Sequence, residues 1–284
     1  MDETPSLPTL IVDPAGRAGQ LALRAAARTH PGRVREGNED SVLLIRLTGL
    51  LAGGASPEMG FFAVADGMGG HESGEVASRR VLQHLGAAVI DRVFKRTLLT
   101  GRAAGGAWME RALGECSRAA NAELLALQRA NHSNMGTTLT AALLIDGRAT
   151  VANVGDSRTY RWRGGALEQI TRDHSLVASL VAAGQLEPDA VYNHEQKGMI
   201  YRSVGESDDL RVDMFSIDLW PDDRLLLCSD GLWEMVRDEG LAAVLAAEPE
   251  PQAVCDRLID EANRAGGEDN ISVLVVWAAP VASS

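Results

Sequence analysis

The stretch Phe61–His71, which reads FFAVADGMGGH, decides the architecture of this chain. An apolar run leads directly into the carboxylate of Asp66, and a glycine-rich turn and a histidine follow. The run predicts a buried strand that carries Asp66 to the rim of a core. Because a buried charge is costly unless a metal ion or a counter-charge meets it, we expect Asp66 to be the central ligand of a metal site.

The composition allows a large core and argues against one class of partner. Of the 284 residues, 45% are hydrophobic and only 4% are aromatic, so the core is expected to consist mainly of Ala, Val and Leu. The formal net charge of −12 argues against general nucleic-acid binding, which uses a basic surface. The charge agrees with a protein that gathers carboxylates around divalent cations, although many soluble proteins are equally acidic.

The cysteines and the amino terminus predict a cytoplasmic protein. Cys116, Cys228 and Cys255 are few, odd in number and far apart, which indicates a reducing compartment without a disulfide framework. The first residues, MDETP, are acidic, unlike the basic start of a signal peptide. No apolar run approaches the roughly 18 residues that a membrane-spanning helix needs, so we expect no membrane partner.

Hydrophobic periodicity predicts strands and helices in alternating groups. Residues 1–20 are expected to form an extension with at most one edge strand, and Leu50–Gly60 is expected to be a loop. Weak alternation at Leu21–Arg28 and apolar runs bounded by turns predict strands, which are expected at Leu21–Arg28, Val42–Leu47, the run before Asp66, Thr137–Ile145, Arg148–Val154, Ser157–Trp162, Arg211–Ile217, Arg224–Cys228 and Ser272–Trp277. Apolar residues at three- to four-residue steps predict helices at Glu72–Phe94, Ala107–Arg129, His174–Ala183, Asp238–Ala247 and Pro251–Arg264.

This order of elements favours an α+β fold. Antiparallel strand meanders interleaved with pairs of helices differ from the strict alternation that builds a parallel sheet. We therefore expect a sandwich in which helices cover the outer faces of the sheets. No linker-like stretch interrupts the chain, so residues 21–279 are predicted to form one domain, which we expect to be a monomer.

Five aspartates share one sequence context, since each lies at a strand end or in a tight turn beside Gly or Asn. They are Asp40, Asp66, Asp156, Asp230 and Asp269. One such residue alone most often marks a turn. Five at the ends of core strands are expected to converge on one rim of the sandwich. All-oxygen ligands suit Mg²⁺ or Mn²⁺ better than zinc.

A cluster of aspartates can hold two such ions, which lower the pKa of a shared water so that the resulting hydroxide attacks an electrophile such as phosphorus. Phosphoryl chemistry also needs a cation that orients phosphate oxygens and an acid that protonates the leaving group. Arg35 is the candidate cation and His71 the candidate acid, with His132, His174 and His194 as alternatives. Either candidate could instead be an ordinary surface or helix-start residue.

The same residues resemble a known family, the metal-dependent serine/threonine protein phosphatases of the protein phosphatase 2C (PPM) family, in its bacterial branch. The matching segments follow the family's order over about residues 21–277. They read VREGNEDS from Val34, VADGMGGH from Val64, MGTT from Met135, ANVGDSR from Ala152, TRDHS from Thr171, CSDGLW from Cys228 and EDNIS from Glu268. The departures are the extension before residue 20 and insertions near 50–60 and 97–107, and none removes a ligand.

The resemblance implies a four-layer αββα sandwich, with two central antiparallel sheets flanked by helix pairs. It implies that Asp66 bridges two Mn²⁺ or Mg²⁺ ions, that the Gly67 carbonyl binds one of them, and that Asp230 and Asp269 complete the other. Asp40 would act through bound water, and Asp156 would help to hold a third, weaker ion.

The resemblance also implies a function and its partners. Arg35 would bind the substrate phosphate and His71 would be the general acid. Residues 173–204 would form the family's flap, which contacts substrate. Hydrolysis of phosphoserine and phosphothreonine on proteins would proceed without a covalent intermediate and would reverse the action of a cognate serine/threonine kinase.

Three other functions compete with this interpretation. A cysteine-dependent phosphatase needs an Arg six residues after the Cys, where this chain has Ala122, Glu234 and Glu261. A two-metal nuclease fits the chemistry, but the acidic charge argues against it. An inactive phosphoprotein-binding relative is a further alternative, although such chains usually lack a metal aspartate.

Overall fold

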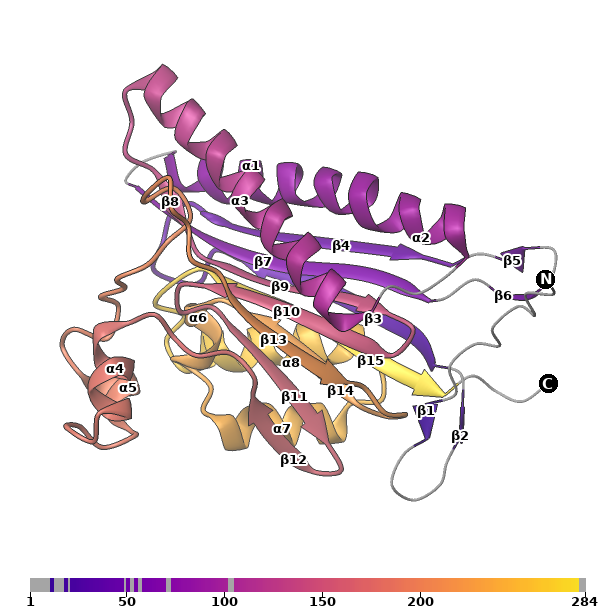
Figure 1. The fold of residues 1–284 in the computed structure, drawn as a ribbon. Coiled ribbons are helices and arrows are strands. Elements are labelled where there is room, and N and C mark those ends of the chain that lie inside the picture. Colours follow the sequence, from indigo (N-terminus) through magenta and orange to yellow (C-terminus); the bar gives the residue numbers. More distant parts are fainter. Residues whose placement is uncertain are drawn as a thin grey trace.

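The architecture is the predicted four-layer α+β sandwich. The computed structural model describes residues 11–12, 18–19, 21–48, 50–51, 54–55, 58–69, 73–101 and 105–280. Two antiparallel sheets stack face to face, and helices cover both outer faces (Figure 1). The fold class is therefore as expected from the sequence.

The first sheet carries the stretch that decides the architecture. Its strands lie in the order β13 (Asp213–Asp218), β10 (Arg148–Val154), β9 (Leu139–Ile145), β7 (Met59–Met68) and β4 (Asp40–Leu47), and β8 (Gly136–Thr137) extends the pairing of β7. Residues 59–65 of β7 are all buried, because a helix covers one face of this central strand and the second sheet covers the other. Burial on both faces explains the continuous apolar run.

The second sheet has five strands and also pairs antiparallel throughout. Its order is β12 (Ala166–Gln169), β11 (Arg158–Arg163), β14 (Arg224–Cys228), β15 (Ile271–Pro280) and β3 (Leu21–His30). The weak alternation at the start of the chain thus forms a complete ten-residue strand, paired along its whole length with β15.

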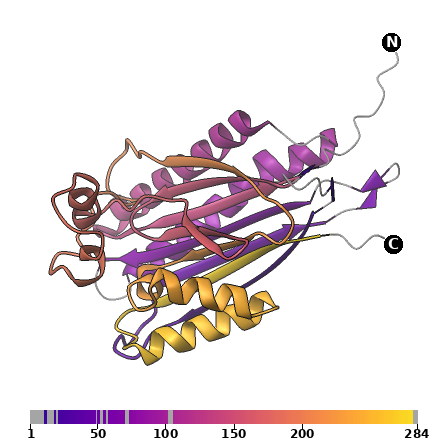
Figure 2. The same ribbon diagram turned by 90° about the horizontal axis from the view of Figure 1, so that it is seen from below.

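Helices flank both sheets, and a small helical segment projects beyond them. The first sheet is covered by α1 (Ser73–Val89), the π-helical η1 (Ile90–Phe94), α2 (Lys95–Thr100) and α3 (Gly106–Asn131). The second is covered by α6 (Asp230–Trp233), α7 (Asp238–Ala247) and α8 (Pro251–Arg264). Helices α4 (Leu176–Ala182) and α5 (Ala190–Asn193) lie beyond one end of the sheets (Figures 1 and 2).

Strand alternation divides the apolar residues among three interior layers. In β7, Phe61 packs toward α1 and α3, whereas Phe62 packs between the two sheets. In β14, Leu227 lies between the sheets and Leu226 packs under the helices of the other side. Successive side chains of a strand point to opposite faces, so each core strand contributes to two layers.

The structure corrects several local predictions. The first helix does not end near Phe94 but continues through η1 to Thr100. Short elements were missed at β12, α5 and α6, because four residues carry no measurable period. The expected loop at Leu50–Gly60 contains a small pair, β5 (Leu50–Leu51) with β6 (Gly54–Ala55). Strand β1 (Ile11–Val12) pairs only with β2 (Ala18–Gly19) among the described strands, not with the sandwich edge.

Candidate metal centre

Asp40 and Asp66 face each other across two paired strands at one end of the sandwich. They are directly opposite in the register of β4 and β7. Asp40 is 6% exposed, and its Oδ2 accepts a hydrogen bond of 2.7 Å from Ser229 Oγ. The backbone of Asp66 is fixed by Thr138, whose Oγ1 accepts from the Asp66 N–H at 3.0 Å and whose N–H donates to the Asp66 carbonyl at 2.8 Å. These hydrogen bonds thus fix the backbone of Asp66 and one carboxylate oxygen of Asp40.

Gly67 lies where the chain leaves no room for a side chain. Its N–H donates to the Glu39 carbonyl at 3.2 Å, and a Cβ atom at this position would overlap the carbonyl oxygen of Gly74. The start of helix α1 therefore packs directly against the strand end that carries Asp66. This close approach explains why the aspartate is followed by glycine.

The other three aspartates come from separate elements. Asp156 lies in the turn between β10 and β11 and is 4% exposed. Asp230 is the first residue of α6, and Asp269 precedes β15. A cleft of about 730 Å³ brings them together with Asp66. It is lined by Arg35, Glu36, Gly37, Asn38, Glu39, Asp66, Gly67, Met68, Gly69, Glu75, Thr138, Asp156, Gly198, Ile200, Asp230, Asp269 and Asn270. Asp40 lies behind this cleft and does not line it.

The carboxylates raise one another's pKa. Burial raises the pKa of Asp66 well above its usual range, and the charges of Asp40, Asp230 and Asp156 raise it further. Burial likewise raises the pKa of Asp40 to about 6 and, with the charge of Asp173, that of Asp156 to about 7. Asp40, Asp66 and Asp156 form no ion pair within the described residues, so the chain does not neutralise these three acids.

Two buried carboxylate oxygens bear on whether the aspartates at the cleft suit a cation. Asp40 Oδ1 and Asp230 Oδ1 are buried and have no hydrogen-bond partner within the described residues. Orphaned carboxylate oxygens among like charges fit a divalent cation with oxygen ligands, such as Mn²⁺ or Mg²⁺. However, no three His, Cys, Asp or Glu side chains in the described ranges already stand at the spacing of a formed metal site. The donors are present and adjacent, and the ligand set stays a prediction.

Arg35 lies at the edge of the cleft and is paired with one of the predicted ligands. Its Nη2 donates to Asp269 Oδ2 at 2.6 Å, and the two side chains are 57% and 36% exposed. This hydrogen bond and the charge of Asp269 raise the pKa of Arg35 further. The sequence did not predict the ion pair, because the two residues are far apart in the chain.

Of the four histidines considered as general acid, three lie within the described residues. His71, the predicted general acid, lies outside them. His174 is 2% exposed and does not line the cleft, and burial lowers its pKa. His132 ends helix α3 with a φ of 50°, and His194 follows α5. His174 is thus a buried structural residue rather than an exposed acid.

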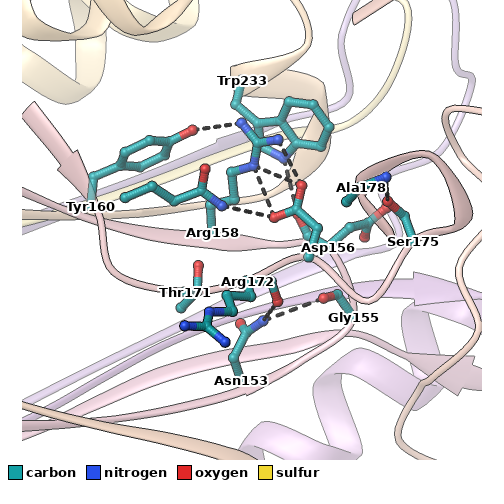
Figure 3. A network of polar contacts seen from close by, with 12 residues as sticks. Asn153, Gly155, Asp156, Arg158, Tyr160, Thr171, Arg172, Ser175, Ala178 and Trp233 are labelled. Carbon is teal, nitrogen blue, oxygen red and sulfur yellow. Dashed lines mark hydrogen bonds and ion pairs between the residues drawn. The ribbon is translucent and has the colours of Figure 1, made fainter. Parts of the chain in front are cut away.

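Sequence reasoning missed a buried ion-pair network beside Asp156. Arg158 donates to both carboxylate oxygens of Asp173, at 2.7–3.1 Å, and to the Tyr160 hydroxyl at 2.8 Å. Its guanidinium stacks on the Trp233 ring at 3.5 Å, and Trp233 Nε1 donates to the Asp156 carbonyl at 3.0 Å (Figure 3). The one signal available was an Arg two residues after Asp156, since the partners are contributed by distant segments.

The fold and the cleft define a two-sheet α+β protein with an oxygen-donor site, and comparisons with known proteins identify its family. A model of the protein phosphatase 2C family matches residues 53–261. A serine/threonine phosphatase, stp, of Listeria innocua is 35% identical over 259 residues, which cover 89% of this chain and 95% of that protein. The serine/threonine protein phosphatase PstP of Mycobacterium tuberculosis is 37% identical over 257 residues, 90% of this chain and 45% of PstP.

Solved structures agree with these sequence matches. A structure of the PstP catalytic domain in complex with two manganese ions has a TM-score of 0.75 at 35% identity and covers 91% of this chain and 99% of that one. Stp1 of Staphylococcus aureus has a TM-score of 0.77 at 30% identity, with coverage of 94% and 99%. The chain therefore belongs to the protein phosphatase 2C family, whose relatives named above are serine/threonine phosphatases. Its described residues include no helix long and apolar enough to cross a membrane.

Proposed function

We propose that this chain hydrolyses phosphoserine and phosphothreonine on proteins with the help of Mn²⁺ or Mg²⁺. The observation that carries the proposal is the cleft in which Asp66, Asp156, Asp230 and Asp269 lie beside Arg35. Anionic ligands for a cation and a guanidinium for a phosphate stand side by side there, as transfer of a phosphoryl group to water requires.

The residues that would hold the cations are the aspartates that line the cleft or lie just behind it, together with Gly67. Asp66 would be shared between two ions, with the Gly67 carbonyl on one side and Asp230 and Asp269 on the other. Asp40 would act through water, and Asp156 would contribute to a third, weaker site. When bound, such ions supply positive charge for the phosphate and a water of lowered pKa as the nucleophile.

Arg35 would orient the substrate phosphate. Only its Nη2 is engaged by a partner among the described residues, so the remaining N–H donors can bind phosphate oxygens. The bond between phosphorus and the serine or threonine oxygen breaks, and that oxygen needs a proton. His71 is our candidate donor, because it follows Asp66 by five residues.

Direct attack by water is favoured over a cysteine nucleophile. All three cysteines are buried, and burial raises the pKa of Cys116 to about 11 and of Cys255 to about 12 and also raises that of Cys228. None of them lines the cleft. Without an accessible thiolate, no covalent phosphocysteine intermediate is expected.

The partners follow from the reaction. Phosphorylated proteins would be the substrates, and a serine/threonine kinase would supply them. The cytoplasmic location, the monomeric state and the division into an extension (1–20) and one domain (21–279) stay predictions of the sequence.

Phosphate release tests the proposal directly. We expect Mn²⁺- or Mg²⁺-dependent release of phosphate from a phosphothreonine peptide and from an aryl phosphate, and complete loss of activity with a chelator. The Asp230→Asn variant should lose turnover and weaken Mn²⁺ binding. If the metal-loaded protein shows no turnover while Asp230→Asn binds metal and phosphopeptide as the wild type does, the chain is a binding protein instead.

A further inference from the structure

The two ends of the flap, residues 173–204, are joined to each other at its base. The Leu176 N–H donates to the Met199 carbonyl at 2.9 Å, and the Tyr201 N–H donates to the His174 carbonyl at 2.9 Å. An isolated bridge between Ser175 and Ile200 continues this pairing. The flap therefore leaves the sandwich as a closed loop, and His174 lies at its base.

The buried His174 also binds the turn that carries Asp156. The His174 N–H donates to the Gly155 carbonyl at 2.9 Å, and the Gly155 N–H donates to His174 Nδ1 at 3.0 Å. Gly155 has a φ of +100°, and a Cβ there would overlap the side chain of Thr138. The turn thus requires glycine at residue 155, and the imidazole is bonded to its backbone.

The second ring nitrogen of His174, Nε2, contacts Asp213 and Arg202. His174 Nε2 lies 3.2 Å from Asp213 Oδ2 and 2.9 Å from Arg202 Nη1, and the same Arg202 Nη1 donates to Asp213 Oδ1 at 2.7 Å. Because Nδ1 accepts from the backbone, the neutral ring carries its proton on Nε2, from which it donates to Asp213. One side chain therefore spans the Asp156 turn, the outgoing end of the flap at Arg202 and the first residue of β13.

We propose that His174 is a positioning residue that fixes the flap relative to the turn carrying Asp156. The flap contributes Gly198 and Ile200 to the wall of the cleft that the aspartates also line. The orientation of this wall relative to Asp156 is set through the imidazole. The proposal rests on the proposed function only for its kinetic consequence, since the structural link can be measured without any substrate.

Amide hydrogen exchange of the metal-free protein tests the link itself. In His174→Ala the Gly155 amide loses its acceptor, and we expect its exchange to accelerate at least about tenfold, as loss of one buried hydrogen bond allows. The Tyr201 amide should accelerate with it, whereas the amides of β9 should not. His174→Asn keeps an acceptor near Nδ1 and should protect Gly155, and His174→Gln should retain only the contact with Asp213.

His194→Ala is the matched control, because among the described contacts the side chain of this flap histidine accepts only from the Gln196 N–H, within the flap itself. It should leave the Gly155 amide unchanged. If His174→Ala does not fold, the Asn and Gln variants decide the question by their opposite effects on Gly155. Unchanged Gly155 exchange in every folded His174 variant would overturn the proposal.

The kinetic test separates positioning from general damage. A phosphothreonine peptide extends beyond its phosphate group on both sides and can contact more of the flap than a small aryl phosphate can. His174→Ala should therefore raise KM for the peptide about tenfold and change KM for the aryl phosphate less than about twofold. An equal loss on both substrates, without a change in the peptide KM, overturns the positioning role. If the wild type hydrolyses neither substrate, the proposed function fails while the exchange result still stands.

Discussion

Two groups of buried charges lie next to each other in this molecule, and they differ in how they are neutralised. At the candidate metal centre, Asp40, Asp66 and Asp230 oppose like charges, and burial raises the pKa of each. Beside it, Arg158 and Asp173 form a two-pronged ion pair in which the side chains are only 4% and 3% exposed.

This difference in neutralisation indicates a structural role for the Arg158 network and a ligand-binding role for the aspartates. The Arg158 network is completed by residues of the chain, so it can fix the backbone around Asp156 without any ligand. The aspartates leave two buried oxygens unpaired within the described residues, so their charge calls for a cation from outside. A self-contained network thus supports a site that the chain leaves incomplete.

The largest expected effect comes from removing one charge of the incomplete group. Asp230→Asn should reduce kcat on a phosphothreonine peptide by roughly a thousandfold, since a ligand and its charge are lost together. Thermal unfolding of the metal-free variant should not occur at a lower temperature than in the wild type, because one of several repelling charges is gone. A metal-free variant that is clearly less stable would show that Asp230 is already neutralised by the chain.

The opposite behaviour is expected in the self-contained network. Asp173→Asn leaves Arg158 buried without its counter-charge and should lower the free energy of unfolding by about 3 kcal/mol, measured by urea denaturation. Asp189→Asn is the matched control, because Asp189 and Arg237 form an exposed pair, 74% and 47% exposed, that should contribute less than about 1 kcal/mol. Equal losses in the two variants would show that the buried pair contributes no more to stability than the exposed one.

The sequence predicted the incomplete group better than the self-contained one, for a physical reason. Each aspartate of the candidate metal centre lies at or near the end of a core strand or in a turn, close to Gly or Asn, so a local pattern can single it out as a candidate ligand, and Asp66 is the strongest case. The Arg158 network joins side chains 15 and 75 residues away, at Asp173 and Trp233, and no local pattern encodes such contacts. The pairing of Arg35 with Asp269 was missed for the same reason.

The secondary-structure elements likewise divide into those that a local sequence pattern predicted and those that it missed. The continuous apolar run of β7 and the helical periods of α3 and α8 are long enough to be recognised, so these elements were predicted to within a few residues. The four-residue elements β12, α5 and α6 have no such pattern. Their conformation depends on tertiary packing, as in α6, where Leu232 and Trp233 are buried against the second sheet.

A third prediction concerns pH and metal together. The pKa values of Asp40, about 6, and of Asp156, about 7, lie above the ordinary value of 3.8. The folded metal-free protein therefore holds protons that the unfolded chain releases, and its stability falls as pH rises from about 4 to about 7. The lowered pKa of His174 acts in the opposite direction below its ordinary value of 6.5.

Bound Mn²⁺ removes this penalty, because it stabilises the ionised carboxylates. At about 100 times the dissociation constant Mn²⁺ should add about 2.7 kcal/mol of stability at pH 7.5. The same concentration should add less at pH 5, where protons compete for the ligands. Thermal melts at both pH values measure the difference. An equal increment at pH 5 and pH 7.5 would mean that the raised pKa values do not belong to the metal ligands.

The smallest expected effect concerns Arg35. This residue lies at the candidate metal centre, but like the residues of the Arg158 network it already has a counter-charge, Asp269, and unlike them it is exposed. Arg35→Ala should raise KM for a phosphopeptide by about tenfold, since one charge-assisted contact to phosphate is lost. Its loss also frees Asp269, so Mn²⁺ affinity, measured by calorimetry, should stay equal or increase slightly. Arg33→Ala is the control, because Arg33 is a neighbouring exposed arginine that does not line the cleft. An unchanged KM in Arg35→Ala, or a matching rise in Arg33→Ala, would assign phosphate recognition to other residues and leave Arg35 as a partner of Asp269 alone.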